Sequence, residues 1–164
     1  KERYSHDIIA KNKEFVINLT NKQLTYATDW CGVRTGAKVD KFKEMHLTKE
    51  KGKFVKCPLI KESPVSIECK VVEIKELGSH DMFMAEILSI DADEKYIDNK
   101  GAFDITKCDL ITYANGKYFT LGKQVGKFGY SVDKKKDLEK KVEEVKKIEK
   151  PKKRKYENRK KKKG

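Results

Sequence analysis

Residues 65–90, VSIECKVVEIKELGSHDMFMAEILSI, decide the fold of this chain. Apolar and polar residues alternate from Val65 onward, with a one-residue change of phase at Val72. Alternation with a period of two is typical of a strand that buries one face. After a turn at Gly78, Met82–Ile90 forms a second apolar segment of similar length. The sequence therefore predicts a long antiparallel hairpin.

Shorter elements flank this hairpin on both sides. We expect a short helical segment with Ser5 or His6 near its start, then a strand at Phe15–Ile17. Helical turns follow over Asn21–Asp29 and from Val39, and strands at Leu110–Thr112 and Tyr118–Leu121. The last two strands enclose an Asn-Gly dipeptide, which favours a tight hairpin turn. Several short strands with few long helices predict a mainly β fold, an antiparallel barrel or sandwich with short helical insertions.

Most of the net positive charge lies at the C-terminal end. The chain carries a net charge of +13, but residues 133–164 hold 17 Lys/Arg against 7 Asp/Glu, which leaves only +3 for residues 1–132. The length predicts one domain, which we place at residues 1–132. Residues 133–164 are interpreted as a charged helix, with an apolar stripe from Leu138 to Ile148, followed by a disordered lysine-rich tail.

The sequence also argues against several classes of protein. Its apolar stretches fall far short of the roughly 20 residues that cross a bilayer, and no leader pattern opens it, so we expect a cytoplasmic protein without a membrane partner. The four cysteines are spaced by 26, 12 and 39 residues without a Cys-x-x-Cys pair, which argues against a zinc site and a disulfide framework.

Five local patterns follow one another in the order RYSHDII (3–9), EFVINL (14–19), CGVRTGAKVDKF (31–42), GSHDMFMAEI (78–87) and YFTLGKQVGKFGYSV (118–132). In this order they resemble the flavin reductase-like family, and in particular its flavoredoxin-like members. The resemblance implies a Greek-key split barrel that binds FMN and forms a homodimer with the flavin at the subunit interface. Family members carry further strands before the first pattern, so this chain is expected to lack the family's N-terminal part.

Arg3 and Ser5 are the candidate ligands of the flavin phosphate. The resemblance places the segment from Arg3 to Ser5 at the phosphate, and an Arg guanidinium can hold phosphate with a fork of donors. Ser5 adds a hydroxyl donor near a helix start. The alternative is that Ser5 only caps the helix and that Arg3 is solvated.

Three further residues are candidates for contact with the flavin ring. The resemblance places Lys41 and His80 near the flavin, with Asp81 suited to orient the His80 imidazole, while Phe128 is an aromatic ring that can stack. Each has an alternative: a solvated lysine, ordinary hairpin-turn chemistry, and a core aromatic, respectively.

The resulting functional hypothesis is an FMN-dependent oxidoreductase of the flavin reductase type. It would pass electrons from NADH, NADPH or a protein donor through bound flavin to an acceptor, with the protein supplying binding and orientation. The sequence contains no GxGxxG fingerprint, so a nicotinamide would bind without a Rossmann domain. The alternative is a non-enzymatic basic β-barrel protein that contacts nucleic acid through its tail, but only the lysines of the tail support that partner.

Overall fold

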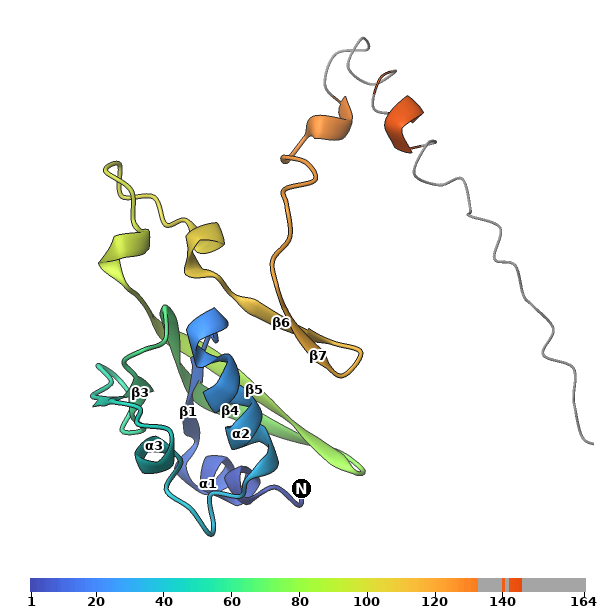
Figure 1. Cartoon of the computed structure of the whole chain (residues 1–164). Coiled ribbons are helices and arrows are strands. Elements are labelled where there is room, and N and C mark those ends of the chain that lie inside the picture. Colours follow the sequence, from blue (N-terminus) through green and yellow to red (C-terminus); the bar gives the residue numbers. More distant parts are fainter. Residues whose placement is uncertain (133–139, 141, 146–164) are drawn as a thin grey trace, which may run out of the picture. The chain divides into compact units, whose positions relative to one another are not determined.

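The computed structural model describes residues 1–132, 140 and 142–145, in a chain that divides into two compact units, Lys1–Gly122 and Lys123–Gly164 (Figure 1). The first unit contains, in order, α1 (Tyr4–Asn12), β1 (Glu14–Asn18), η1 (Lys22–Leu24), α2 (Thr25–Val33), α3 (Lys41–Glu44), β2 (Lys49–Glu50), β3 (Leu59–Ile60), β4 (Val65–Leu77), β5 (His80–Ala92), η2 (Glu94–Tyr96), η3 (Ile105–Cys108), β6 (Ile111–Ala114) and β7 (Lys117–Thr120), where η marks a 3-10 helix. The second unit contains η4 (Tyr130–Val132).

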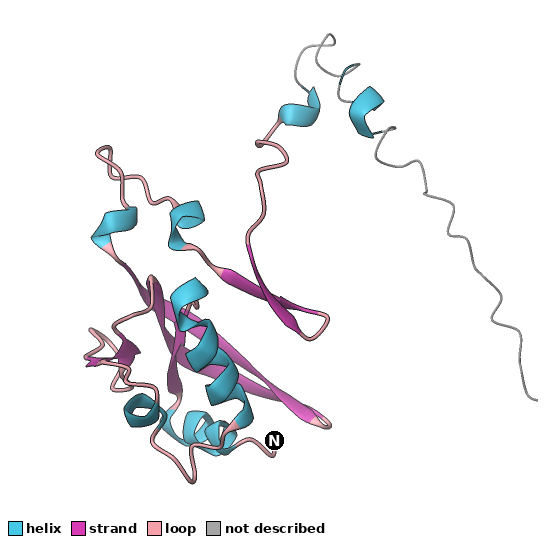
Figure 2. Cartoon of the chain, in the orientation of Figure 1, coloured by secondary structure: helices cyan, strands magenta, loops and turns pink. Residues whose placement is uncertain are grey.

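The β4–β5 hairpin is the centre of the first unit. Strand β4 pairs antiparallel with β5 on one side and with β1 on the other (Figure 2). Gly78 turns between the two long strands with a φ of +77°. The register passes from Val71 to Glu73 and skips Val72, so a β-bulge lies where the sequence changes phase. The predicted hairpin is confirmed, and the bulge explains the break in its alternation.

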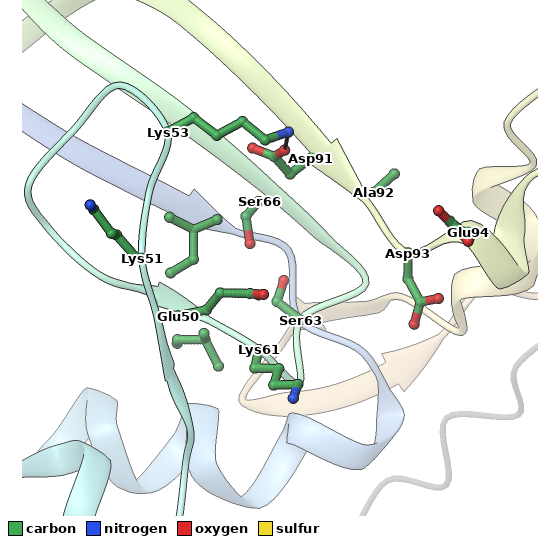
Figure 3. A pocket seen from close by; sticks show the side chains of 12 residues that line it. Glu50, Lys51, Lys53, Lys61, Ser63, Ser66, Asp91, Ala92, Asp93 and Glu94 are labelled. Carbon is green, nitrogen blue, oxygen red and sulfur yellow. Dashed lines mark hydrogen bonds and ion pairs between the residues drawn. The ribbon is translucent and has the colours of Figure 1, made fainter.

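One face of the sheet is polar and holds the segment that contains β2 and β3. Side chains from all three strands bind this segment: Lys56 N donates to Glu14 at 2.8 Å, Ile60 N donates to Asn18 at 3.0 Å, and Lys53 pairs with Asp91. Figure 3 shows Lys53 reaching across to Asp91 at the side of a hollow of about 420 Å³. Hydrogen bonds, rather than apolar packing alone, therefore hold the segment on the sheet.

Glu68 is the most buried member of this polar face, with no exposed surface. Its carboxylate accepts backbone hydrogen bonds from Lys53, Phe54 and Val55 at 3.0, 2.8 and 2.9 Å. Burial works to raise the pKa of Glu68, but the three N–H donors outweigh it and hold this pKa below its ordinary value. The backbone at Gly52 also approaches closely, because a Cβ there would lie 2.8 Å from the Glu68 carboxylate. Glu68 thus fixes the path of the loop over the sheet.

The opposite face of the sheet carries an exposed apolar row. Ile17, Ile67 and Ile90 lie directly opposite one another on the three strands, so their side chains share a face. Ile17 is 46% exposed and Ile90 is 61% exposed. Ile87, in the next row, is also exposed, since the register skips Leu88 and keeps Ile87 on the face of Ile90. We call Ile17, Ile67, Ile87 and Ile90 the isoleucine row.

The remaining predicted elements of the first unit are also present. Helix α1, strand β1, the helical segment η1–α2 and helix α3 match the expected order, and β6 and β7 join through Asn115 and Gly116, both with positive φ. The two-residue strands β2 and β3 were not predicted. Of the expected C-terminal helix only residues 140 and 142–145 are described, and these are helical. The lysine-rich tail lies outside the described residues, and the domain boundary at 132 stays a prediction.

No helix in the described part of the chain is both long and apolar enough to cross a membrane. The four cysteines are free thiols: Cys69 and Cys108 are buried, while Cys31 and Cys57 are partly buried.

Replacing Glu68 by Gln should destabilise the first unit by about 2–4 kcal/mol, because the amide places a donor against backbone N–H groups in a buried position. The folded pKa of Glu68 lies below its ordinary value of 4.5, so this stabilisation is full above that pH and declines as pH falls through the folded pKa. Urea unfolding of both proteins across this range measures the difference.

The exposed Glu73, on the same strand, provides the control. Glu73→Gln should change the free energy of unfolding by about 0.5 kcal/mol or less. Equal effects of the two substitutions would show that the Glu68 hydrogen bonds contribute little to stability.

Candidate functional site

The first turn of α1 presents donors that the protein itself does not use. Arg3 is the N-cap residue, in extended conformation, and its side chain caps no N–H group. Ser5 is the second helical residue, so the alternative in which Ser5 caps the helix is wrong. Within residues 1–132, 140 and 142–145, neither side chain makes a hydrogen bond or ion pair. A guanidinium and a hydroxyl are therefore exposed together at a helix start.

A cluster of charged side chains attaches this turn to the β4–β5 hairpin. Nε2 of His6 lies 2.8 Å from Oδ2 of Asp81, and Nδ1 of His6 lies 2.8 Å from Oδ1 of Asp7. Nζ of Lys1 lies 3.1 Å from Oδ1 of Asp81 and 3.0 Å from Glu76. Asp81 is the buried member, with 7% of its side chain exposed. We call Lys1, His6, Asp7, Glu76 and Asp81 the hairpin cluster.

The cluster favours the charged form of both central groups. The pKa of His6 is raised by its hydrogen bonds to Asp7 and then to Asp81, against the opposing effect of burial. Burial works to raise the pKa of Asp81, but pairing with His6 and Lys1 holds it below its ordinary value. An imidazolium donates from both ring nitrogens, so His6 links the helix to the hairpin best when protonated.

His80 begins strand β5 and is exposed at the hairpin turn. Its Nδ1 lies 2.9 Å from the Ser79 hydroxyl, and Asp81 does not orient it. Successive residues of a strand point to opposite faces, so Asp81 turns toward α1 while His80 turns away from it. The predicted His80–Asp81 pair is therefore wrong, and the pair that forms is His6–Asp81.

Lys41 begins helix α3 and ties it to α2. Its Nζ donates to the carbonyl oxygen of Cys31 at 2.6 Å, so the alternative of a merely solvated lysine is wrong. Burial raises the pKa of the Cys31 thiol despite the nearby Lys41 ammonium, which disfavours a reactive thiolate.

Lys41 also lines an open hollow of about 550 Å³. Residues 36–41 form its wall together with Lys49. The same loop lies against the helix α1, since a Cβ added at Gly36 would be 3.4 Å from the Tyr4 ring. The lysines of the hollow and the donors of Arg3 and Ser5 thus belong to adjoining segments.

Phe128 belongs to the second compact unit and is fully exposed. It is therefore not a core aromatic. Its proposed contact with a flavin stays a prediction, as do the cofactor roles of Arg3, Ser5, Lys41 and His80.

Sequence reasoning missed His6 and Asp81 as partners. Both lie inside the patterns quoted for the family resemblance, but they are 75 positions apart. The available signal was the helix at residues 4–12 combined with the alternation of β5, which predicts that Asp81 faces away from His80.

The exposed donors suit a phosphate monoester. A phosphate of this kind carries close to two negative charges at neutral pH and is bound by Arg, by hydroxyl groups and by N–H groups at a helix start. Arg3, Ser5 and the first N–H groups of α1 supply all three kinds of donor. The residues present therefore fit the phosphate end of FMN.

Comparison with known proteins identifies the family and the fold of this chain. The family model described as "Flavin reductase like domain" matches residues 1–122. Flavoredoxin of Desulfovibrio vulgaris is 28% identical, with a TM-score of 0.74 over 80% of this chain and 72% of that chain. A Shewanella frigidimarina protein with a split barrel domain is 21% identical, with a TM-score of 0.67 over 77% of this chain and 65% of that one. The predicted split-barrel fold is confirmed.

A sequence relative from Archaeoglobus fulgidus, an uncharacterized protein, is 35% identical over 118 residues, which make up 72% of this chain. This chain spans 66% of that relative's length, and 50% and 57% of the length of two others.

Proposed function

This chain belongs to the flavin reductase-like domain family, and on that premise we propose that it binds FMN and acts as an oxidoreductase. Bound FMN would supply the hydride and electron transfer chemistry, from NADH, NADPH or a protein donor to an acceptor. The role of the protein would then be to bind and orient the flavin. The similarity to a flavoredoxin supports the reading as a flavoprotein.

The observation that carries the proposal is the first turn of α1. Its Arg3 guanidinium and Ser5 hydroxyl have no partner among the described residues, and helix N-termini favour anions. A guanidinium and a hydroxyl that are unpaired in the described part of the chain suit an anion at a helix start, and we assign them to the FMN phosphate.

We assign two further residues to the ring end of the flavin. Lys41 has one donor on the Cys31 carbonyl and keeps two others for an anionic ring edge. His80 presents an exposed imidazole at the tip of the β4–β5 hairpin. The next residue, Asp81, contacts His6 of α1. We assign both to the ring or to a substrate above it, and we assign Phe128 to stacking.

We also propose that the protein works as a homodimer. The isoleucine row supports a partner on that face. Its apolar side chains are contiguous across three strands, with Ile17, Ile87 and Ile90 exposed, and exposed apolar patches are typical of protein interfaces. A second copy of this chain is the occupant we assign.

Purified protein should contain FMN. Visible absorbance should show a flavin, and denaturation should release FMN rather than FAD, because the phosphate site has donors for one phosphate monoester. Colourless protein that gives no signal on titration with FMN would contradict the proposal.

Replacing Arg3 by Ala should weaken FMN binding about 10- to 150-fold and leave riboflavin nearly unaffected, because riboflavin lacks the phosphate. His80→Ala should instead weaken both ligands by similar factors, or change the reoxidation rate of reduced flavin. Fluorescence titration with the two flavins measures the contrast. Equal losses for both flavins in Arg3→Ala would remove Arg3 from the phosphate site.

The dimer is tested on the isoleucine row. Ile90→Glu should shift the protein from dimer to monomer in sedimentation, since a buried unpaired carboxylate is costly at an interface. Tyr26→Glu, at an exposed position of α2, is the control and should leave the dimer intact. A monomeric parent protein, or a dimer that withstands Ile90→Glu, would show that the row has another occupant.

A further inference from the structure

Directional side-chain contacts link α1 to the β4–β5 hairpin. Helix α1 has no fully buried residue, so apolar packing alone does not define its position. The side-chain contact of its first turn with the sheet is the bond of 2.8 Å between Nε2 of His6 and Oδ2 of Asp81, while its C-cap residue Lys13 accepts a backbone bond from Val71 of β4. The His6 ring also stands edge-on to Phe83 of β5, with ring centroids 5.5 Å apart. His6 is thus held by two residues of one strand.

This link begins one residue away from the proposed phosphate ligands. Ser5 precedes His6, and Arg3 lies at the start of the same turn. On the other side of the link, Asp81 follows His80 directly. A single hydrogen-bonded pair therefore connects the segment assigned to the phosphate with the segment assigned to the ring.

We propose that Asp81 is a positioning residue for FMN: acting through His6, it fixes the Arg3–Ser5 turn at a set distance from the hairpin that carries His80. This inference rests on the proposed function. A ligand with a phosphate at one end and a ring at the other gains from both groups only when the two segments are held in register. Asp81 itself touches no part of the flavin.

The buried position of Asp81 makes the link directional. One of its oxygens takes the His6 bond, while the other lies 3.1 Å from the Lys1 ammonium in an ion pair but has no hydrogen-bond partner among the described residues. His6 therefore supplies the directional contact of this carboxylate. Asp7, by contrast, is 90% exposed on its side chain and lies on the same helix as His6. A bond within one helix cannot set the position of that helix on the sheet, so Asp7 is the matched control.

The experiment measures the preference for FMN over riboflavin, as the ratio of their dissociation constants, in the parent protein and in five variants. Asp81→Asn and His6→Leu should reduce this preference about 5- to 30-fold, with riboflavin affinity changed about 2-fold or less. His6→Gln should keep most of the preference, because its amide N–H can replace Nε2 as a donor. Asp7→Asn should also keep it. Arg3→Ala shows how large the loss of FMN preference is when the phosphate contact itself is removed.

Two measurements separate a positioning role of Asp81 from a role in protein stability. In nuclear magnetic resonance, the His6 ring should titrate at lower pH in Asp81→Asn than in the parent protein, which shows that the pair exists in solution. If Asp81→Asn does not fold, the FMN preference of His6→Leu is compared with that of His6→Gln instead. The His6 side chain is 20% exposed, so both substitutions should be tolerated by the fold.

The outcomes are distinct. A parent protein without preference for FMN would overturn the proposed function itself. If the parent prefers FMN and Arg3→Ala abolishes the preference, but Asp81→Asn and His6→Leu retain it, only the positioning role is wrong. Equal weakening of FMN and riboflavin binding in Asp81→Asn and His6→Leu would also overturn the positioning role. The pair would then support the fold as a whole rather than the position of the Arg3–Ser5 turn.

Discussion

The buried carboxylate of Glu68 is the interaction on which the first unit depends. A carboxylate without solvent contact is tolerated only when its oxygens are well hydrogen-bonded, and here three successive N–H groups of the loop after Gly52 meet that need. The loop in turn covers the polar face of the sheet, including Glu14 and Asn18. Loss of the carboxylate would therefore leave donors unpaired in the loop and polar side chains uncovered on the strands.

The same sheet shows how one set of strands can serve two purposes. Its polar face is occupied by the chain's own loop, and its isoleucine row faces outward. Bulges at Val72 and Leu88 decide which side chains reach each face, because an extra residue reverses the alternation beyond it. The Leu88 bulge keeps Ile87 on the face of Ile90, so a single-residue irregularity enlarges the exposed isoleucine row.

Local patterns in the sequence were enough for most of the fold but not for the contacts between distant segments. The alternation around Val65 and the glycine at Gly78 specify the hairpin, since period and turn chemistry are local properties. The strands β2 and β3, of two residues each, leave no periodic signal. Ser5 was placed correctly near a helix start, yet Arg3 takes the N-cap position. The partner of Asp81 depends on where α1 docks, which is a tertiary property, and adjacency in sequence suggested His80 instead.

The bond between His6 and Asp81 also has a consequence for how the protein acquires its site. The two residues are 75 positions apart, and contacts between distant segments require the intervening chain to be organised before they form. The helix can form locally, but its place on the hairpin requires β1 to pair with β4 and β4 with β5. In the proposed function, competence to distinguish a phosphorylated ligand would therefore be a property of the completed tertiary structure, and it would report on the final stage of folding.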